Sequence, residues 1–332
     1  MEKFVNLHLD GDSGTPKFRQ LANAVNNAIA EGRMQTGDAL PSVSSICVKY
    51  DLSRDTVFKA YSILREQGVV VSQPGKGYFI ADHILKVFVF LDTFKAYKEV
   101  LYDSFFHSLP SNVIADVNFH HYNSHVFKRL IEDSVGRYSK FIVMPFISPE
   151  VDAALSLIPK NKLLIIDWNV YADRANSVIY QDFGNALYVG LSTVIDRLRR
   201  YKELHFLYPA YTNHPHDSVD AFLRFCNING FSSVVETDPD DFNVTRGVAY
   251  VSVSDRMLGR FLQQCRDKNL ALGSDVGMIS YNETPMKPFI ENGITVFSTD
   301  FNKMGQLAAK FVTDDKDMNV CVPSKIIVRS SL

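Results

Sequence analysis

The stretch LSRDTVFKAY, Leu52–Tyr61, decides how the first quarter of the chain folds. Apolar residues recur in and just after it at helical spacing, which predicts a helix that buries one stripe of side chains. The predicted buried residues are Val57, Ala60, Tyr61 and Leu64. Ser53 stands at the N-cap position, and the opposite face carries a cation in its first turn and an aromatic ring one turn further on. The outward residues are Arg54, Asp55, Phe58, Lys59 and Ser62.

The segments around this helix predict a winged helix-turn-helix over residues 1–81, here called the head. Residues 15–32, TPKFRQLANAVNNAIAEG, carry one apolar stripe, and a second helix begins after Ser42, a predicted N-cap. The interval between the second and third helices leaves room only for a tight turn. Residues 69–80, VVVSQPGKGYFI, then predict two short strands joined by a turn that contains glycine.

Four motifs of the head are GDALPS at 37–42, LSRDTV at 52–57, LREQGVV at 64–70 and GKGYF at 75–79. Together they resemble the DNA-binding domain of the GntR family of bacterial regulators. The resemblance implies that a helix N-terminus binds phosphate, that the first turn of the third helix meets base edges, and that the wing reaches the DNA backbone or minor groove. The implied DNA contacts are Ser42, Ser44, Ser53, Arg54, Thr56, Phe58, Lys59, Lys76 and Gly77.

Two positions depart from the pattern of that family, which often has arginine at both. This chain has Ser44 and Phe58 there, so its operator sequence or affinity is expected to differ from the family's. Phe58 either meets a thymine methyl group or packs under the wing. The alternative for the whole head is a winged helix that binds protein, with Arg54 and Lys59 merely solvated.

The overall composition places limits on function. The 332 residues carry a formal net charge of −2, so nucleic-acid binding requires a local patch. The four cysteines form no CxxC pair, and this favours reduced thiols in a cytoplasm rather than disulfides or zinc. No signal peptide or membrane-spanning run is evident, so a cytoplasmic location without membrane contact is expected. The HH at 120–121 and HPH at 214–216 lack evident partner ligands, so no metal and no cofactor are predicted.

Residues 86–332, here called the body, alternate continuous apolar runs with amphipathic segments. Runs such as KFIVMPF at 140–146, KLLIIDW at 162–168 and VAYVSVS at 248–254 are typical of parallel strands covered on both faces. The alternation predicts an α/β fold with two doubly wound lobes. Ligands of such sheets bind beyond the carboxyl ends of the strands, and here those ends are rich in aromatic rings, carboxylates and amides. Such side chains suit a sugar, and the glycine-rich loop that a nucleotide requires is missing.

Segments of the body, including SVIYQDFGNALYVGLSTVI at 177–195, VSVSDRMLGRFL at 251–262 and LGSDVGMISYNET at 272–284, resemble the effector domain of the LacI/GalR family. That domain is similar to periplasmic sugar-binding proteins. The resemblance places Tyr97, Asp255 and Asn282 at ligand-contacting positions. The family's pocket arginine would fall near Ser218 and is missing, so either His216 takes its place or the ligand needs no bidentate cation.

Seven residues are therefore candidates for ligand binding: Phe94, Tyr97, Trp168, Asp182, His216, Asp255 and Asn282. Each also has a structural explanation. Asp255 could cap the helix after Ser254, Asp182 could order the next helix, Asn282 could be a turn residue, and Trp168 could pack in the core. Because no lysine or arginine is evident at the strand ends, the expected ligand is a small neutral sugar.

These features together predict a transcriptional regulator, a repressor of sugar-utilisation genes, whose sugar binds between the lobes. A single head offers few phosphate contacts, so a homodimer on a pseudo-palindromic operator is expected. One alternative is a fusion whose body is an enzyme acting on a sugar or another small metabolite, but no nucleophile and base appear together. The other alternative is a transport binding protein, which the head argues against.

Overall fold

The computed structural model describes residues 15–332 except 31–32, 67, 82–84, 111–112 and 315. Residues 1–14 of the predicted head, and most of the predicted interval between head and body, lie outside the described residues. The chain divides into two compact units, Met1–Lys86 with Pro110–Ile114 and Val87–Leu109 with Ala115–Leu332. The head and the body are described separately below.

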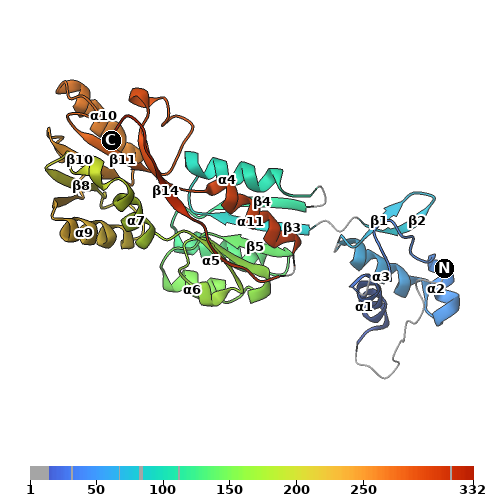
Figure 1. Cartoon of the computed structure of the whole chain (residues 1–332). Helices are drawn as coiled ribbons and strands as arrows, with labels where there is room; N and C mark the ends of the chain where they lie inside the picture. Colours follow the sequence, from blue (N-terminus) through green and yellow to red (C-terminus); the bar gives the residue numbers. More distant parts are fainter. Residues whose placement is uncertain (1–14, 31–32, 67, 82–84, 111–112, 315) are drawn as a thin grey trace. The chain divides into compact units, whose positions relative to one another are not determined.

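The head contains the predicted three helices and hairpin (Figure 1). Its elements are α1 (Lys17–Ala30), α2 (Val43–Tyr50), α3 (Arg54–Glu66), β1 (Val70–Gln73) and β2 (Gly77–Ile80), with β1 and β2 antiparallel. The hydroxyl of Ser42 accepts a hydrogen bond from the amide of Ser45 at 3.1 Å, and that of Ser53 accepts one from the amide of Thr56 at 3.1 Å. Both predicted N-caps are therefore present.

The core of the head is built on the predicted stripe of α3. Val57, Ala60, Tyr61 and Leu64 are fully buried against α1 and the wing. The Tyr61 hydroxyl donates to the carbonyl of Pro41 at 2.8 Å, which ties α3 to the start of α2. The turn of the wing needs glycine because Gly75 and Gly77 have φ of +75° and +108°, values that other residues rarely adopt.

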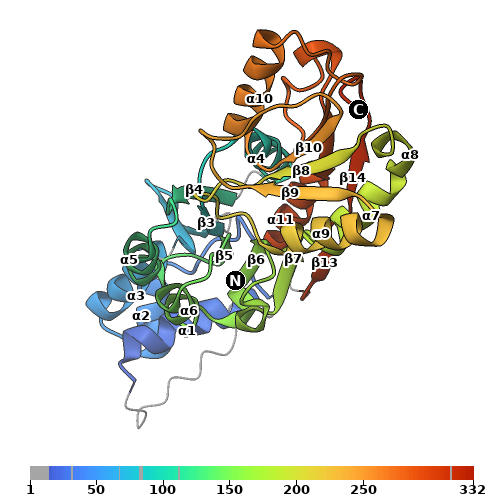
Figure 2. The ribbon, with the colours of Figure 1, turned by 90° about the vertical axis from the view of Figure 1, so that its left-hand side faces the viewer.

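The first lobe of the body is a six-stranded sheet in the order β13-β7-β6-β5-β3-β4 (Figure 2). The strands are β3 (Leu85–Leu91), β4 (Val113–Phe119), β5 (Lys140–Val143), β6 (Leu163–Asp167), β7 (Ser177–Tyr180) and β13 (Asn319–Cys321). The helices are α4 (Ala96–His107), α5 (Ser124–Ser134), α6 (Pro149–Leu155) and α11 (Phe301–Thr313). Leu163 to Ile166 of the central strand β6 are fully buried, as the continuous apolar run predicted.

The second lobe is a six-stranded sheet in the order β14-β12-β11-β10-β8-β9. The strands are β8 (Glu203–Leu207), β9 (Ser232–Glu236), β10 (Val248–Ser252), β11 (Gly277–Tyr281), β12 (Thr295–Thr299) and β14 (Ser324–Ile327). The helices are α7 (Asn185–Thr193), α8 (Ile195–Leu198), α9 (Asp217–Asn229) and α10 (Asp255–Asp267). All strand pairs of this sheet are parallel except β12 with β14. The two doubly wound lobes that the sequence predicted are therefore present.

The chain passes between the two sheets after β7, after β12 and after β13, as the strand orders require. These three crossing segments connect the two lobes, and they are called the hinge below. Within the part of the chain that the structure describes, no helix is long and apolar enough to cross a membrane.

Candidate functional site

The outward face of α3 presents the side chains that the sequence assigned to DNA. Ser53, Arg54 and Lys59 are exposed, and Phe58 keeps 45% of its surface exposed. This exposure leaves part of the Phe58 ring accessible to a ligand. The Lys59 ammonium lies 4.3 Å from the ring centroid of Phe18, so it is held toward α1.

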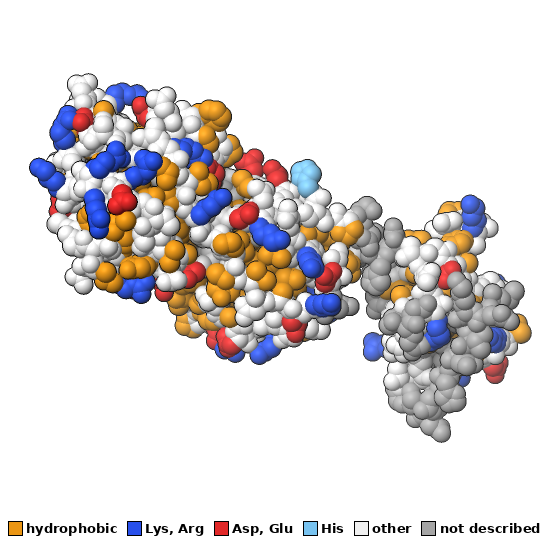
Figure 3. Space-filling view, in the orientation of Figure 1, with side chains coloured by type: hydrophobic (Ala, Val, Ile, Leu, Met, Phe, Trp, Pro, Cys, Tyr) orange, Lys and Arg blue, Asp and Glu red, His pale blue; other side chains and the backbone are white. Residues whose placement is uncertain are grey.

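The remaining candidates of the head lie at the start of α2 and in the wing. Ser42 and Ser44 are exposed at the N-terminus of α2, and Lys76 and Gly77 are exposed in the turn of the wing. Thr56 is half-buried, and its hydroxyl lies 2.8 Å from that of Ser53. The start of α2, the outer face of α3 and the wing tip are the places where a winged helix-turn-helix meets DNA. The face of the body in Figure 3 instead shows lysines and arginines dispersed among hydrophobic and acidic side chains.

A cavity of about 510 Å³ lies in the body between the carboxyl ends of the two sheets. This volume falls in the range of small-molecule sites. Four of the seven predicted ligand residues line it, namely Tyr97, Trp168, Asp255 and Asn282. Tyr97 packs on Phe301 with ring centroids 4.7 Å apart. The two lobes thus contribute facing walls, with Tyr97 and Trp168 on one and Asp255 and Asn282 on the other.

Phe94, Asp182 and His216 are not among the residues that line this cavity. Phe94 is 58% exposed, although its neighbours Thr93 and Lys95 line the cavity. Asp182 Oδ1 accepts from the amides of Gly184 and Asn185 at 3.0 and 2.8 Å, so Asp182 orders the start of α7. His216 is exposed, with Nδ1 3.3 Å from Asp220 Oδ1. The structural explanation of Asp182 is the one that the geometry supports.

Asp255 is held in place by a buried lysine. Lys287 Nζ lies 2.9 Å from Asp255 Oδ1 and donates to the carbonyls of Tyr281 and Asn282 at 2.7 and 2.8 Å. Burial lowers the pKa of Lys287, and the charge of Asp255 opposes that shift. The helix cap is Ser254, whose hydroxyl accepts from the amide of Met257 at 3.4 Å. The carboxylate of Asp255 is therefore free of a capping role.

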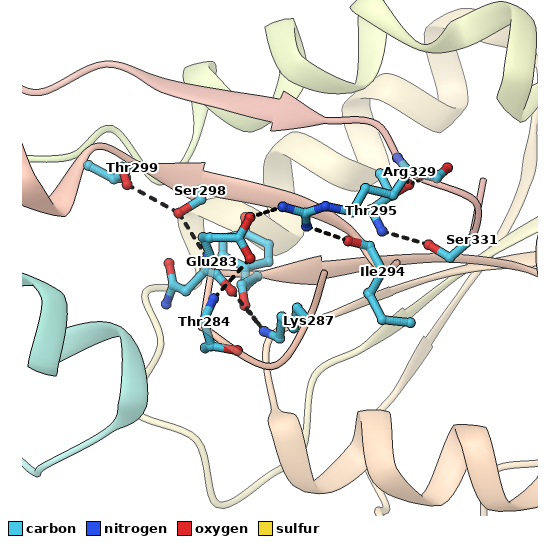
Figure 4. Close-up of polar contacts among 11 residues, drawn as sticks. Glu283, Thr284, Lys287, Ile294, Thr295, Ser298, Thr299, Arg329 and Ser331 are labelled. Carbon is cyan, nitrogen blue, oxygen red and sulfur yellow. Dashed lines mark hydrogen bonds and ion pairs between the residues drawn. The ribbon is translucent and has the colours of Figure 1, made fainter. Parts of the chain in front are cut away.

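Hydrogen bonds and an ion pair hold the turn that contains Asn282. Asn282 has φ of +62°, and its amide donates to the carbonyl of Phe297 at 2.8 Å, so it is a turn residue as well as a cavity wall. The next residue, Glu283, pairs with Arg329, which also donates to the carbonyl of Ile294 at 2.8 Å (Figure 4). Arg329 thereby joins the turn that follows β11 to the residue that precedes β12.

The opposite wall contains a buried acid and lysine that sequence analysis missed. Asp92 lines the cavity, forms an ion pair with Lys98 and accepts a hydrogen bond from the Tyr122 hydroxyl. Lys98 is completely buried, and burial lowers its pKa to about 8. The signal for Asp92 was its place directly after the apolar run of β3.

Asp167 was also missed, although it directly precedes Trp168 at the end of β6. Its Oδ1 accepts from Gln181 Nε2 at 2.6 Å, and its φ of +78° places it in a conformation that costs a non-glycine residue energy. Burial raises the pKa of Asp167, whereas the nearby Lys98 charge acts in the opposite direction. A carboxyl group with this raised pKa can accept hydrogen bonds from a hydroxylated ligand, and when protonated it can also donate one.

His214 and Thr93 line the cavity with polar atoms that have no partner. His214 Nε2 and Thr93 Oγ1 are buried and make no hydrogen bond to any residue that the structure describes. Burial lowers the pKa of His214 to about 3, so its imidazole is neutral. Unsatisfied buried polar atoms are costly, and a polar ligand would satisfy them. Across the described residues, no group of three or more His, Cys, Asp and Glu could hold a metal ion.

Two cations also line the cavity, Lys95 and Arg256. The expectation that the site would lack lysine and arginine is therefore wrong. Lys95 lies in the strand-end segment LDTFKAY, 91–97, and was overlooked, whereas Arg256 lies beyond the strand ends in the first turn of α10. The inference of a neutral ligand loses its basis with this finding.

The chain therefore combines a winged helix-turn-helix with a two-lobed α/β body that has a cavity between its lobes. Residues 17–80 match bacterial regulatory proteins of the gntR family, and residues 192–332 match the periplasmic binding protein-like domain. The chain joins a gntR-type DNA-binding domain to a periplasmic-binding-protein-like body.

Two curated relatives are both named as regulators. An uncharacterised helix-turn-helix regulator of Bacillus subtilis (strain 168) is 28% identical over 26% of this chain and 37% of that protein. The mannosyl-D-glycerate transport/metabolism system repressor of Escherichia coli (strain K12) is 33% identical over 23% of this chain and 31% of that protein. The chain thus spans only about a third of the length of these relatives.

Solved structures of LacI-family regulators share the fold of the body. A LacI-family regulator from Lactobacillus casei with bound sucrose has a TM-score of 0.62 and 12% identity over 74% of this chain and 99% of that one. The trehalose repressor from Escherichia coli has a TM-score of 0.62 and 11% identity over 73% and 99%. A dimeric Lac repressor has a TM-score of 0.62 and 13% identity over 74% and 98%.

Proposed function

We propose that this protein is a ligand-responsive DNA-binding regulator, a repressor of carbohydrate-utilisation genes that acts in the cytoplasm. The observation that carries the proposal is that one chain contains both a DNA-binding domain and a ligand-sized cavity. The head carries an exposed recognition helix with Arg54 in its first turn, and the body has a polar and aromatic cavity between hinged lobes. The names of several matched relatives, including the mannosyl-D-glycerate repressor, support regulation of carbohydrate metabolism.

The residues proposed to bind DNA are those exposed at the start of α2, on α3 and in the wing. Arg54 reads a base edge, the N-termini of α2 and α3 bind phosphates, and Lys76 contacts the backbone. A single head offers few cations to the DNA backbone. Two heads of a homodimer therefore bind the two half-sites of a pseudo-palindromic operator. The dimeric state of a LacI-family relative in the solved structures supports this arrangement.

The ligand proposed for the cavity is a small sugar or sugar derivative. Tyr97 and Trp168 stack on the apolar faces of the ring, and Asp255, Asn282 and Asp167 bind its hydroxyl groups. Because these groups belong to both lobes, the ligand contacts all of them only when the lobes close. A ligand that prefers the closed state shifts the population toward it, and this changes how a dimer holds its two heads.

The test uses the full-length protein and two measurements. Operator sequences are selected from a random DNA library, and sugars, sugar acids and sugar phosphates are screened by thermal shift. A ligand at about 100 times its dissociation constant stabilises the protein by about 2.7 kcal/mol. We expect a hit to change operator affinity and to be recovered chemically unchanged. A hit that is consumed, or a library that yields no enriched sequence, contradicts the proposal.

One variant links the hit to the cavity. Asp255→Ala is expected to weaken the ligand by about 1–3 kcal/mol, the cost of a lost hydrogen bond to a charged group, and to leave operator binding without ligand unchanged. The matched control is Asp196→Ala, because Asp196 is 92% exposed on α8 and lies outside the cavity lining. Equal ligand affinity in Asp255→Ala and the wild type would show that the ligand binds elsewhere.

A further inference from the structure

The cavity carries two cationic side chains that face it from opposite lobes. Lys95 stands at the N-cap position of α4 in the first lobe, and Arg256 lies in the first turn of α10 in the second. Within the described part of the chain, neither side chain forms an ion pair. Arg256 lies 5.8 Å from the ring centroid of Tyr211, a contact that orients the guanidinium without neutralising it.

The acidic side chains of the cavity form their ion pairs and hydrogen bonds with other residues. Asp92 pairs with Lys98 and Asp255 pairs with Lys287, so those charges cancel. Asp167 accepts from Gln181 Nε2 at 2.6 Å, and the charges of Lys98 and Lys95 oppose the rise in its pKa that burial causes. Lys95 and Arg256 are therefore the cations that line the cavity without a carboxylate within ion-pair distance among the described residues.

Two helix N-termini add to the positive potential. Helices α4 and α10, of 12 and 13 residues, both begin at the cavity, and the backbone dipole makes such an end attractive to anions. At the N-cap of α4, Lys95 makes no side-chain hydrogen bond to the helix. Nearby, His214 Nε2 and Thr93 Oγ1 are buried polar atoms without a partner among the described residues.

We propose that the physiological ligand carries an anionic group, a carboxylate or phosphate, that binds between Lys95 and Arg256. This inference rests on the proposed function of the cavity as the ligand site. The sugar ring occupies the aromatic walls, and the anion draws the two lobes together because it pairs with one cation from each. Arg256 binds a carboxylate or phosphate through two parallel hydrogen bonds, whereas Lys95 contributes a point charge.

The experiment compares matched probes on the full-length protein by titration calorimetry. Each set contains a neutral hexose, its uronate and its 6-phosphate, with inorganic phosphate and acetate as additional probes. We expect one anionic sugar to bind at least tenfold more tightly than the neutral member of its set, and its affinity to fall as salt increases. The uronate and phosphate arms identify which anion the site accepts.

Variants assign the effect to the two cations. Arg256→Gln and Lys95→Gln are each expected to weaken the anionic sugar tenfold to a hundredfold and to leave the neutral member within about twofold. The controls are Arg266→Gln, an exposed position further along α10, and Lys303→Gln, an exposed position on α11. All four positions are exposed, so the variants are expected to fold, and the melting temperature of the free protein checks this.

Specific outcomes overturn the inference. A neutral sugar that binds as tightly as its anionic counterparts would refute the anionic ligand and leave the sugar-sensing function intact. Equal losses in the cavity variants and their controls would show that the cations act only through net charge. If no probe of any charge binds and no ligand changes operator affinity, both this inference and the proposed function fail.

Discussion

Thr299 and Gln181 form a hydrogen bond across the hinge of the body. Thr299 Oγ1, at the end of β12, lies 2.7 Å from Gln181 Oε1, just after β7, and 2.6 Å from Ser324 Oγ, at the start of β14. The three crossings between the lobes are thus joined by one chain of side chains. Gln181 also donates to Asp167 at 2.6 Å, and Asp167 lines the cavity. A ligand that contacts Asp167 is therefore connected to the hinge through two hydrogen bonds.

Thr299→Val tests this connection, because valine keeps the shape of threonine and removes both hydrogen bonds. The side chain of Thr299 is 5% exposed, so Gln181 Oε1 loses a buried partner, which costs about 1–3 kcal/mol of unfolding free energy. We expect ligand affinity to change less than the effect of ligand on operator binding. The measurement is operator affinity with and without ligand, and the control is Thr193→Val, an exposed position on α7. An undiminished response to ligand in Thr299→Val would show that the hinge chain does not transmit binding.

Arg54→Ala is expected to reduce operator affinity by about 1–3 kcal/mol, the cost of losing one bidentate base contact, and to relax selectivity at one base pair. Arg54 is exposed in the first turn of α3, so the fold of the head is expected to survive. The control Arg65→Ala removes an exposed arginine from the last turn of the same helix. Binding by fluorescence anisotropy separates the two variants. If Arg54→Ala and Arg65→Ala lose equal affinity, Arg54 contributes only net charge.

The sequence predicted the secondary structure and the buried residues better than it predicted the residues of the cavity. The buried stripe of α3 and the strands of the body were predictable, because helical spacing and continuous apolar runs report burial directly. Asp255 and Asn282, which their motifs placed at ligand-contacting positions, both line the cavity. Asp182 shows the limit of such reasoning, since its position at a strand end does not reveal that its carboxylate accepts from the amides of Gly184 and Asn185.

The cations of the cavity show a second limit. Lys95 and Arg256 lie at helix starts in different lobes. Only the tertiary arrangement of the two lobes brings these residues to the same cavity. The pairing of Asp255 with Lys287 likewise joins residues from separate loops. Sequence spacing within one segment contains no information about contacts of this kind, so the charge of the cavity could be established only from the structure.

Acid is expected to destabilise the body through His120. Its Nδ1 accepts from the amide of Tyr122 at 3.2 Å, and its Nε2 lies 2.9 Å from the carbonyl of Met144. These two contacts suit the neutral imidazole ring in the folded protein. Burial lowers the pKa of His120 to about 4, below its ordinary value near 6.5. The unfolded chain therefore takes up a proton that the folded chain refuses, and stability is lost as the pH falls from about 6.5 to 4.

The measurement is urea unfolding of the wild type and His120→Asn between pH 7.5 and pH 4.5. Asparagine keeps an acceptor near Nδ1 and cannot be protonated, so the variant should lose less stability over this interval than the wild type. His107→Asn is the control, because His107 is exposed at the end of α4. Identical pH dependence in the wild type and His120→Asn would show that other groups cause the acid sensitivity.

Phe58 is expected to read a thymine through its methyl group. It is 45% exposed and one helical turn from Arg54, and the thymine methyl is the apolar group that the major groove offers. Replacing the contacted thymine by deoxyuridine removes only that methyl group, so wild-type affinity should fall severalfold at one position of each half-site. Phe58→Ala should bind both DNAs equally, because the partner of the methyl is gone. If the wild type does not distinguish thymine from deoxyuridine at any operator position, Phe58 has no such role.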